Sequence, residues 1–296
     1  MSDRVLDISE QPARLSVENS LLVLQMEGRD AVTVPLAEIA VLIASHPRIS
    51  LTHAVVSGLA EAGAIFVSCD SRRRPVSMML PLITHSLQAE RFSAQMEMPL
   101  PARKRIWRQI VRAKLMAQGK LLTELKGQDH GLAMLASHVR SGDPQNLEAQ
   151  AARRYWSALF GKYGFRRHAD DDAINACLNY GYAVLRGIAS RALCGAGLHP
   201  CLGVHHHNRY NPFGLADDLM EPFRPVVDRA VFQLCEKHGK NLQLDRDTRQ
   251  FLLAALLGRF VAEKESRTLF DWVTLSSESL ARAILGEREK LDIPGL

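Results

Sequence analysis

The chain changes character in one stretch, Ala64-Ile-Phe-Val-Ser-Cys-Asp-Ser-Arg-Arg-Arg-Pro75, and this stretch decides the fold. Its first half is an apolar run of strand length, which predicts a buried strand over residues 64–69. The arginines and the proline that follow mark a domain boundary. We therefore predict an α+β protein with a small β-rich N-terminal domain (residues 1–75) and a larger all-α catalytic domain (residues 76–296).

Upstream of this stretch, short runs rich in Val, Leu and Ile alternate with polar turn-like clusters, which is typical of strands. Gly28-Arg29-Asp30 separates two such runs and predicts a hairpin. Thr52 is expected to cap a short helix that ends near Gly63. The apolar runs cover residues 5–8, 15–17, 21–26, 31–36 and 39–43.

Downstream, the apolar spacing and the capping residues predict helices. Asp143 followed by Pro144 is a strong helix start, and either Asp171 or Asp172 is expected to cap the next long helix. We expect no further strands. The predicted helices cover residues 86–96, 103–122, 143–161, 172–195, 217–239, 245–263 and 276–285.

Composition restricts the class of protein. With 47% hydrophobic and 23% charged residues among 296, the chain has enough apolar side chains for a core and is not of the disordered type. It contains neither an apolar run of the roughly 18–20 residues that span a bilayer nor a secretory signal. Five widely spaced cysteines are expected to be reduced thiols. These features predict a cytoplasmic protein without a membrane partner.

The stretch from Gly197 to Asp228 brings a run of three histidines close to an acidic helix start. Asp218 and Glu221 are three residues apart and would share one face of a helix. Imidazole and carboxylate ligands together suit Mn²⁺, accept Mg²⁺ less readily and could hold zinc. Without a metal, the same acids would simply complement the helix dipole. A structural zinc site at Cys194, Cys201 and His205 is a weaker alternative, because its cysteine spacing is unusually long.

A second informative stretch runs from Gly142 to Trp156. Glu148 is expected just over one turn into its helix, surrounded by alanines that would let another helix approach closely. Such surroundings can leave a carboxylate in a cleft. The simpler interpretation, a solvated helix glutamate, is more common for any single Glu.

Clustered arginines indicate a polyanionic partner, although the formal net charge is only +5. One helical stripe is formed by Arg105, Arg108 and Arg112, which are three and four residues apart. Lys104 and Lys114 flank this arginine stripe. Aromatic residues are not interleaved with these clusters, so stacking on single-stranded bases is not indicated. The candidate DNA-binding residues are Arg72, Arg73, Arg74, Arg105, Arg108, Arg112 and Arg153.

The chain resembles the CRISPR-associated spacer-acquisition integrase and endonuclease family, and its motifs are similar to those of the type II branch. The resemblance spans about residues 5–290 and is most specific in the helical part. It is carried by Gly142-Asp143, Glu148-Ala-x-Ala-Ala-Arg, Leu178-Asn-Tyr-Gly-Tyr-Ala183, Leu198-His-Pro, Gly203-Val-His-His and Leu215-Ala-Asp-Asp-Leu-Met-Glu-Pro-Phe-Arg-Pro225.

This resemblance implies catalytic metal ligands at Glu148, His206 and Glu221. Asp218 is an accessory or replacement ligand, and His205 and His207 are the neighbouring alternatives to His206. It also implies Mg²⁺ or Mn²⁺ as cofactor, a homodimer with contacts through the β-rich domain, and a small CRISPR-associated partner dimer. The implied reaction inserts a double-stranded DNA fragment into a repeat array by attack of a 3′-hydroxyl on a phosphodiester.

Two other functions are compatible with the residues. A structure-selective metal nuclease of DNA repair would nick branched DNA without joining it. A non-catalytic DNA-binding scaffold would bind DNA after chelation and cleave nothing, but it has no need for the Glu, His and Glu set.

Overall fold

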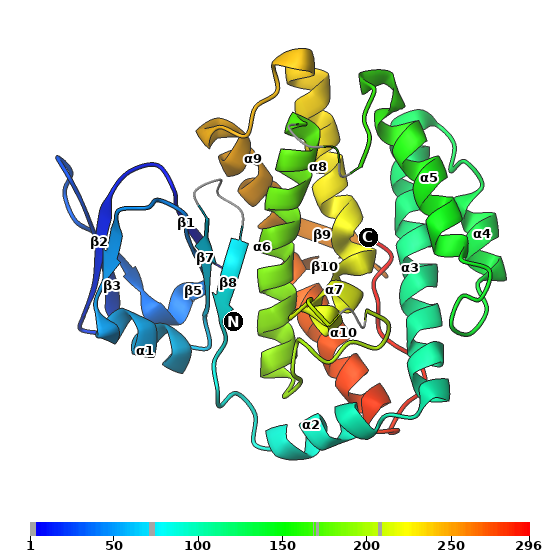
Figure 1. Cartoon of the computed structure of the whole chain (residues 1–296), viewed down its shortest axis with the longest axis horizontal. Coiled ribbons are helices and arrows are strands. Elements are labelled where there is room, and N and C mark those ends of the chain that lie inside the picture. The colour runs from blue at the N-terminus through cyan, green and yellow to red at the C-terminus, as the bar shows by residue number, and fades with distance from the viewer. Residues whose placement is uncertain (1–3, 71–74, 168, 170–171, 207–208) are drawn as a thin grey trace.

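The computed structural model describes residues 4–70, 75–167, 169, 172–206 and 209–296. A β-rich N-terminal part lies beside a larger group of helices, so the predicted α+β class is confirmed (Figure 1). Among the described residues, no helix has both the length and the apolar character needed to cross a bilayer. Arg72, Arg73, Arg74 and His207 lie outside the described residues.

Two four-stranded sheets and one helix form the N-terminal part. One sheet has the order β1 (Arg4–Ile8), β5 (Ile39–Ala44), β7 (Ile65–Cys69) and β8 (Pro75–Met79). The other has the order β4 (Val32–Pro35), β3 (Leu21–Met26), β2 (Ala13–Glu18) and β6 (Ile49–Leu51). Helix α1 (His53–Glu61) completes a separate apolar core that includes Leu15, Leu22 and Leu59. The predicted hairpin at Gly28 is confirmed, because β3 pairs with β4 in antiparallel fashion.

The helical part surrounds α6 (Ala173–Gly195), which begins at the predicted cap Asp172. It packs against α7 (Gly214–Met220), α8 (Arg224–His238), α9 (Arg246–Leu256) and α10 (Leu269–Ile284). On its other side α6 contacts β5 and β7, so one core joins the first sheet to the helices (Figure 1). A Cβ atom at Gly181 would lie 2.4 Å from Val227 Cγ1, so glycine is needed for α6 and α8 to approach this closely.

The long helix α3 (Leu100–Lys126) forms the other wall of the helical part (Figure 1). It packs against α4 (Leu132–His138) and α5 (Leu147–Phe160), and α2 (Gln88–Glu97) leads into it from the linker after β8. Helix α3 also contacts the single 3₁₀ turn Glu221–Phe223 between α7 and α8. These contacts bring together segments that are distant in the sequence.

Several sequence predictions were wrong in detail. The predicted helix 217–239 is broken at Glu221–Phe223, where Pro222 has no N–H to continue the helical hydrogen bonds. The predicted helix 245–263 ends at Leu256, and the hairpin β9 (Arg259–Ala262) and β10 (Glu265–Thr268) follows. With β8, this hairpin shows that strands continue beyond residue 75. The last helix begins at Leu269, seven residues earlier than expected, because Thr268 and Asp271 form a capping box.

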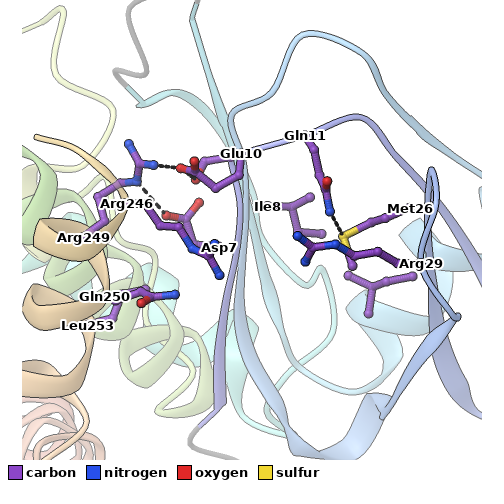
Figure 2. A pocket seen from close by; sticks show the side chains of 12 residues that line it. Asp7, Ile8, Glu10, Gln11, Met26, Arg29, Arg246, Arg249, Gln250 and Leu253 are labelled. Atoms are coloured by element: carbon purple, nitrogen blue, oxygen red, sulfur yellow. Dashed lines mark hydrogen bonds and ion pairs between the residues drawn. The ribbon is translucent and has the colours of Figure 1, made fainter.

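The two parts are joined by a buried ionic contact, which Figure 2 shows. Arg249 of α9 is only 3% exposed and pairs with Glu10 and with Asp7, whose Oδ2 lies 3.6 Å from Nε. Tyr180 of α6 donates a hydrogen bond to the same Asp7 oxygen at 2.7 Å. A pocket of about 350 Å³ lies beside this contact, between α9 and the N-terminal strands. The contact therefore ties α6 and α9 to β1.

Candidate functional site

Glu148 and Glu221 meet at one ammonium group. Lys114 Nζ lies 2.6 Å from Glu148 Oε1 and 2.7 Å from Glu221 Oε2. The three residues come from α5, α3 and the 3₁₀ turn after α7. Lys114 and Glu221 are 8% and 3% exposed. The structure thus brings two of the three predicted catalytic residues together around a buried cation.

Local turn geometry fixes Glu148 at the start of its helix. The expected start at Pro144 was wrong: α5 begins at Leu147 with Asn146 as its cap, and both Asp143 and Asn146 have positive φ. Asp143 still serves the helix, because its carboxylate accepts hydrogen bonds from the N–H groups of Leu147 and Glu148. Glu148 therefore lies in the first helical turn, where the helix dipole favours a negative charge.

Glu221 has a second cationic partner. Arg224 Nη2 lies 3.0 Å from Glu221 Oε1, while Glu221 Oε2, although close to Lys114, has no aligned hydrogen-bond donor. Burial alone would raise the pKa of Glu221, but Arg224 and Lys114 outweigh it and hold the pKa below its usual value. The carboxylate is therefore charged at neutral pH, and each of its oxygens faces a cation: Oε1 faces Arg224 and Oε2 faces Lys114.

His206 is oriented by Asp218. Its Nδ1 lies 2.6 Å from Asp218 Oδ1, and the backbone N–H groups of Val204, His205 and His206 donate to the same carboxylate. Asp218 is fully buried. Since a carboxylate accepts, Nδ1 carries a proton in this arrangement and leaves Nε2 as the free lone pair of the neutral ring. The hydrogen bond with Asp218 raises the pKa of His206, and burial only partly opposes it.

Two glycines and one tryptophan hold this histidine loop in place. A Cβ atom at Gly203 or at Gly214 would lie 2.7 Å from the carbonyl oxygen of His206, so the loop packs against both glycines. Trp107 of α3 is 1% exposed, stacks on the His205 ring at 4.0 Å and meets His206 edge-on at 5.7 Å. The ring of His205 is therefore engaged with Trp107, whereas the ring of His206 contacts Asp218.

The predicted ligand set is only partly assembled. Among the residues that the structure describes, no three His, Cys, Asp or Glu side chains converge as a ready-made metal site. Glu148 and Glu221 share Lys114, whereas His206 is turned toward Asp218. Within the described part of the chain, Cys194, Cys201 and His205 form no such group either. These two cysteines and the histidine are close in the sequence, but their side chains do not meet at one point.

Lys114 and Arg224 are the residues that sequence reasoning missed. Lys114 was assigned to the edge of the arginine stripe, but it lies two residues after Arg112 and thus on the opposite side of α3. Arg112 is exposed and Lys114 is buried. The available signal was this helical offset, together with the apolar residues Val111 and Leu115 beside Lys114.

The described arginines of the stripe follow the outer side of α3. Arg105 and Arg112 are exposed and Arg108 is half-buried, and Arg153 is exposed on α5, five residues after Glu148. A pocket of about 230 Å³ is lined by His206, Arg103 and Arg209. Cations therefore lie on the helices that carry the acidic site and around its histidine.

The two-domain architecture is shared with solved structures. A casposase bound to an integration product aligns with a TM-score of 0.79 at 21% identity, covering 98% of this chain and 92% of that one. A Cas1 protein from Thermotoga maritima aligns with a TM-score of 0.77 at 17% identity, covering 96% and 98%. At such identities the likeness shows the fold: a β-rich domain followed by a larger helical domain.

Sequence relatives identify the family. The family model of the CRISPR associated protein Cas1 matches residues 6–256. The CRISPR-associated endonuclease Cas1 of Neisseria meningitidis is 39% identical over 85% of this chain and 83% of its own length. A second Cas1 endonuclease, from Pyrobaculum aerophilum, is 29% identical over 94% and 98%. The chain belongs to the Cas1 family, as its motifs predicted.

Proposed function

We propose that this chain is a metal-dependent DNA endonuclease and integrase that inserts captured DNA fragments into a CRISPR repeat array. The observation that carries the proposal is the meeting of Glu148 and Glu221, from separate elements, around one cationic group. Membership of a family whose relatives are named endonucleases, and the shared fold of a casposase bound to an integration product, support it.

The acidic site is suited to a divalent ion. The half-buried Glu148 and the buried Glu221 already share a cation, and their carboxylates provide oxygen ligands of the kind that Mg²⁺ and Mn²⁺ prefer. Mg²⁺ commonly takes only one or two carboxylates and completes its shell with water or substrate phosphate. We propose Glu148, Glu221 and the Nε2 atom of His206 as the protein ligands.

The role that we propose for Asp218 is to position His206. Its oxygens already accept from three backbone N–H groups and face His206 Nδ1. A carboxylate on the far nitrogen fixes the tautomer and direction of a metal-binding imidazole and raises its basicity. Direct ligation by Asp218 would require it to give up contacts that hold the histidine loop.

A divalent ion held by Glu148, Glu221 and His206 would polarise the scissile phosphate and stabilise the leaving oxygen. The protein supplies position and charge: Asp218 aims His206, Arg224 keeps Glu221 ionised, and the arginines of α3 and α5 hold the DNA backbone. Their positive charge also reduces the repulsion between an attacking oxygen and the phosphates. We propose Arg105, Arg108, Arg112 and Arg153 for this contact, and Arg72, Arg73 and Arg74 from the sequence alone.

Proposed partners follow from the family and the neighbours. Double-stranded DNA is the substrate, and a solved neighbour is a Cas1–DNA complex with a TM-score of 0.64. Another neighbour is a Cas6-RT-Cas1–Cas2 complex, which supports a small partner of the Cas2 kind. We further propose a homodimer formed through the β-rich domain. A cytoplasmic location is supported by the five free cysteines.

The test is a strand-transfer assay with Mn²⁺, using a labelled DNA fragment and a plasmid that carries the repeat. Glu148→Ala and His206→Ala should each abolish joined products, whereas Glu287→Ala, an exposed glutamate, should not. Integration that persists in both site variants would refute the assignment. Nicking of branched DNA without joined products would favour the repair nuclease, and DNA binding without cleavage under any metal would favour the scaffold.

A further inference from the structure

Lys114 occupies the position that a ligand shared by Glu148 and Glu221 must take. Its ammonium contacts one oxygen of each carboxylate, at 2.6 and 2.7 Å. Val111 and Leu115 beside it on the same helix belong to the apolar core, and Arg224, the other cation at Glu221, acts on it as well. The lysine is therefore not part of the solvent-exposed arginine stripe but an internal counter-ion.

The charges explain why a cation is needed there. Two carboxylates that face one point repel each other when charged, and a buried charge without a partner is strongly destabilising. Arg224 contacts Glu221 through Oε1, so after loss of Lys114 Glu221 would still have a partner. Glu148 is 23% exposed at its side chain and forms its ion pair with Lys114. The ammonium is thus the group that joins Glu148 to Glu221.

A divalent ion would compete for the same space. Mg²⁺ and Mn²⁺ need carboxylate oxygens at about 2.0–2.2 Å, closer than the ammonium contacts, and the Lys114 headgroup stands between the oxygens. The lysine side chain is flexible enough to withdraw its headgroup while its stem stays packed.

We propose that Lys114 is a built-in competitor of the catalytic metal: its ammonium bridges Glu148 and Glu221 in the metal-free protein and must leave that position when a divalent ion binds. This inference rests on the proposed metal site. Lys114 stabilises the empty site and lowers its affinity for the ion. It is a positioning residue, because it acts through the two carboxylates.

The test is direct binding of Mn²⁺, measured by calorimetry and by electron paramagnetic resonance of the free ion, on wild type, Lys114→Met and Lys104→Met. Lys104 is an exposed lysine of the same helix and serves as the matched control. We expect Lys114→Met to bind Mn²⁺ about ten-fold tighter or more, because a positive charge beside the ion has gone. Without metal it should unfold at a lower temperature, and Mn²⁺ should raise that temperature more than in wild type.

Equal or weaker Mn²⁺ binding by Lys114→Met, with normal binding by wild type, would overturn this inference and leave the proposed function intact. Wild-type binding that Glu148→Ala does not weaken would instead place the ion elsewhere, and both proposals would fall. Should Lys114→Met not fold, Lys114→Gln provides the same comparison, because it removes the charge but keeps a polar group that can donate to one carboxylate.

Discussion

Replacing Asp228 by Asn should make the stability of the protein less sensitive to pH. Asp228 is fully buried in α8 and accepts hydrogen bonds from Tyr155 of α5, at 2.7 Å, and from Tyr182 of α6. Burial raises the pKa of this carboxyl to about 6, although both tyrosines and the nearby Arg224 act in the opposite direction. The residue thus joins the helix of Glu148 to α6 and α8.

The sign and size of the effect follow from this pKa. Because the folded value of about 6 exceeds the ordinary value of 3.8, folding favours the protonated form. The stability associated with protonated Asp228 is fully present below pH 3.8 and is lost as pH rises through about 6. The full loss is about 3 kcal/mol, of which about 2 kcal/mol falls between roughly pH 4 and 7.5.

The measurement is urea unfolding of wild type and Asp228→Asn at several pH values in that range. The loss is read as the change with pH in the difference between their free energies of unfolding. Asparagine fits the site, since its oxygen can accept from one tyrosine and its amide group can donate to the other. Tyr155→Phe is an informative control, because losing one donor should move the transition to higher pH. A difference between wild type and Asp228→Asn that stays constant across the range would refute the reasoning.

Two further substitutions test the supports of the site. Gly214→Ala should displace the His206 loop, because the new Cβ would lie 2.7 Å from the carbonyl oxygen of His206. The affinity for Mn²⁺ should then fall about ten-fold or more, while the cooperative thermal transition remains. Unchanged affinity would contradict the proposed role of the loop. Arg249→Met should lower the free energy of unfolding by roughly 3–5 kcal/mol, because it leaves the buried Asp7 without its cationic partner, and Asp7→Asn in the same chain should recover part of the loss. If the double variant is no more stable than Arg249→Met alone, the stranded charge is not the cause.

Local patterns in the sequence predicted much of the fold. Hydrophobic periodicity and capping residues placed α6 from Asp172 and the strand pair around Gly28, because these features depend on neighbours within a few residues. The predictions that failed were those in which a local signal was ambiguous. Asp143 reads as an N-cap, but left-handed backbone at Asp143 and Asn146 moved the helix start to Leu147. The residues after Leu256 have a helical pattern in the sequence, but in the structure they form β9, which pairs with β10.

The sequence by itself determined the family, the two-part architecture and the identity of the acidic and histidine residues that we propose as ligands. Only the tertiary structure decided how these groups meet: Lys114 between Glu148 and Glu221, and Asp218 turned toward the histidine loop. The physical reason is that helical periodicity assigns a residue to one side of its own helix. What lies opposite that side depends on how α3, α5 and the turn after α7 pack against one another.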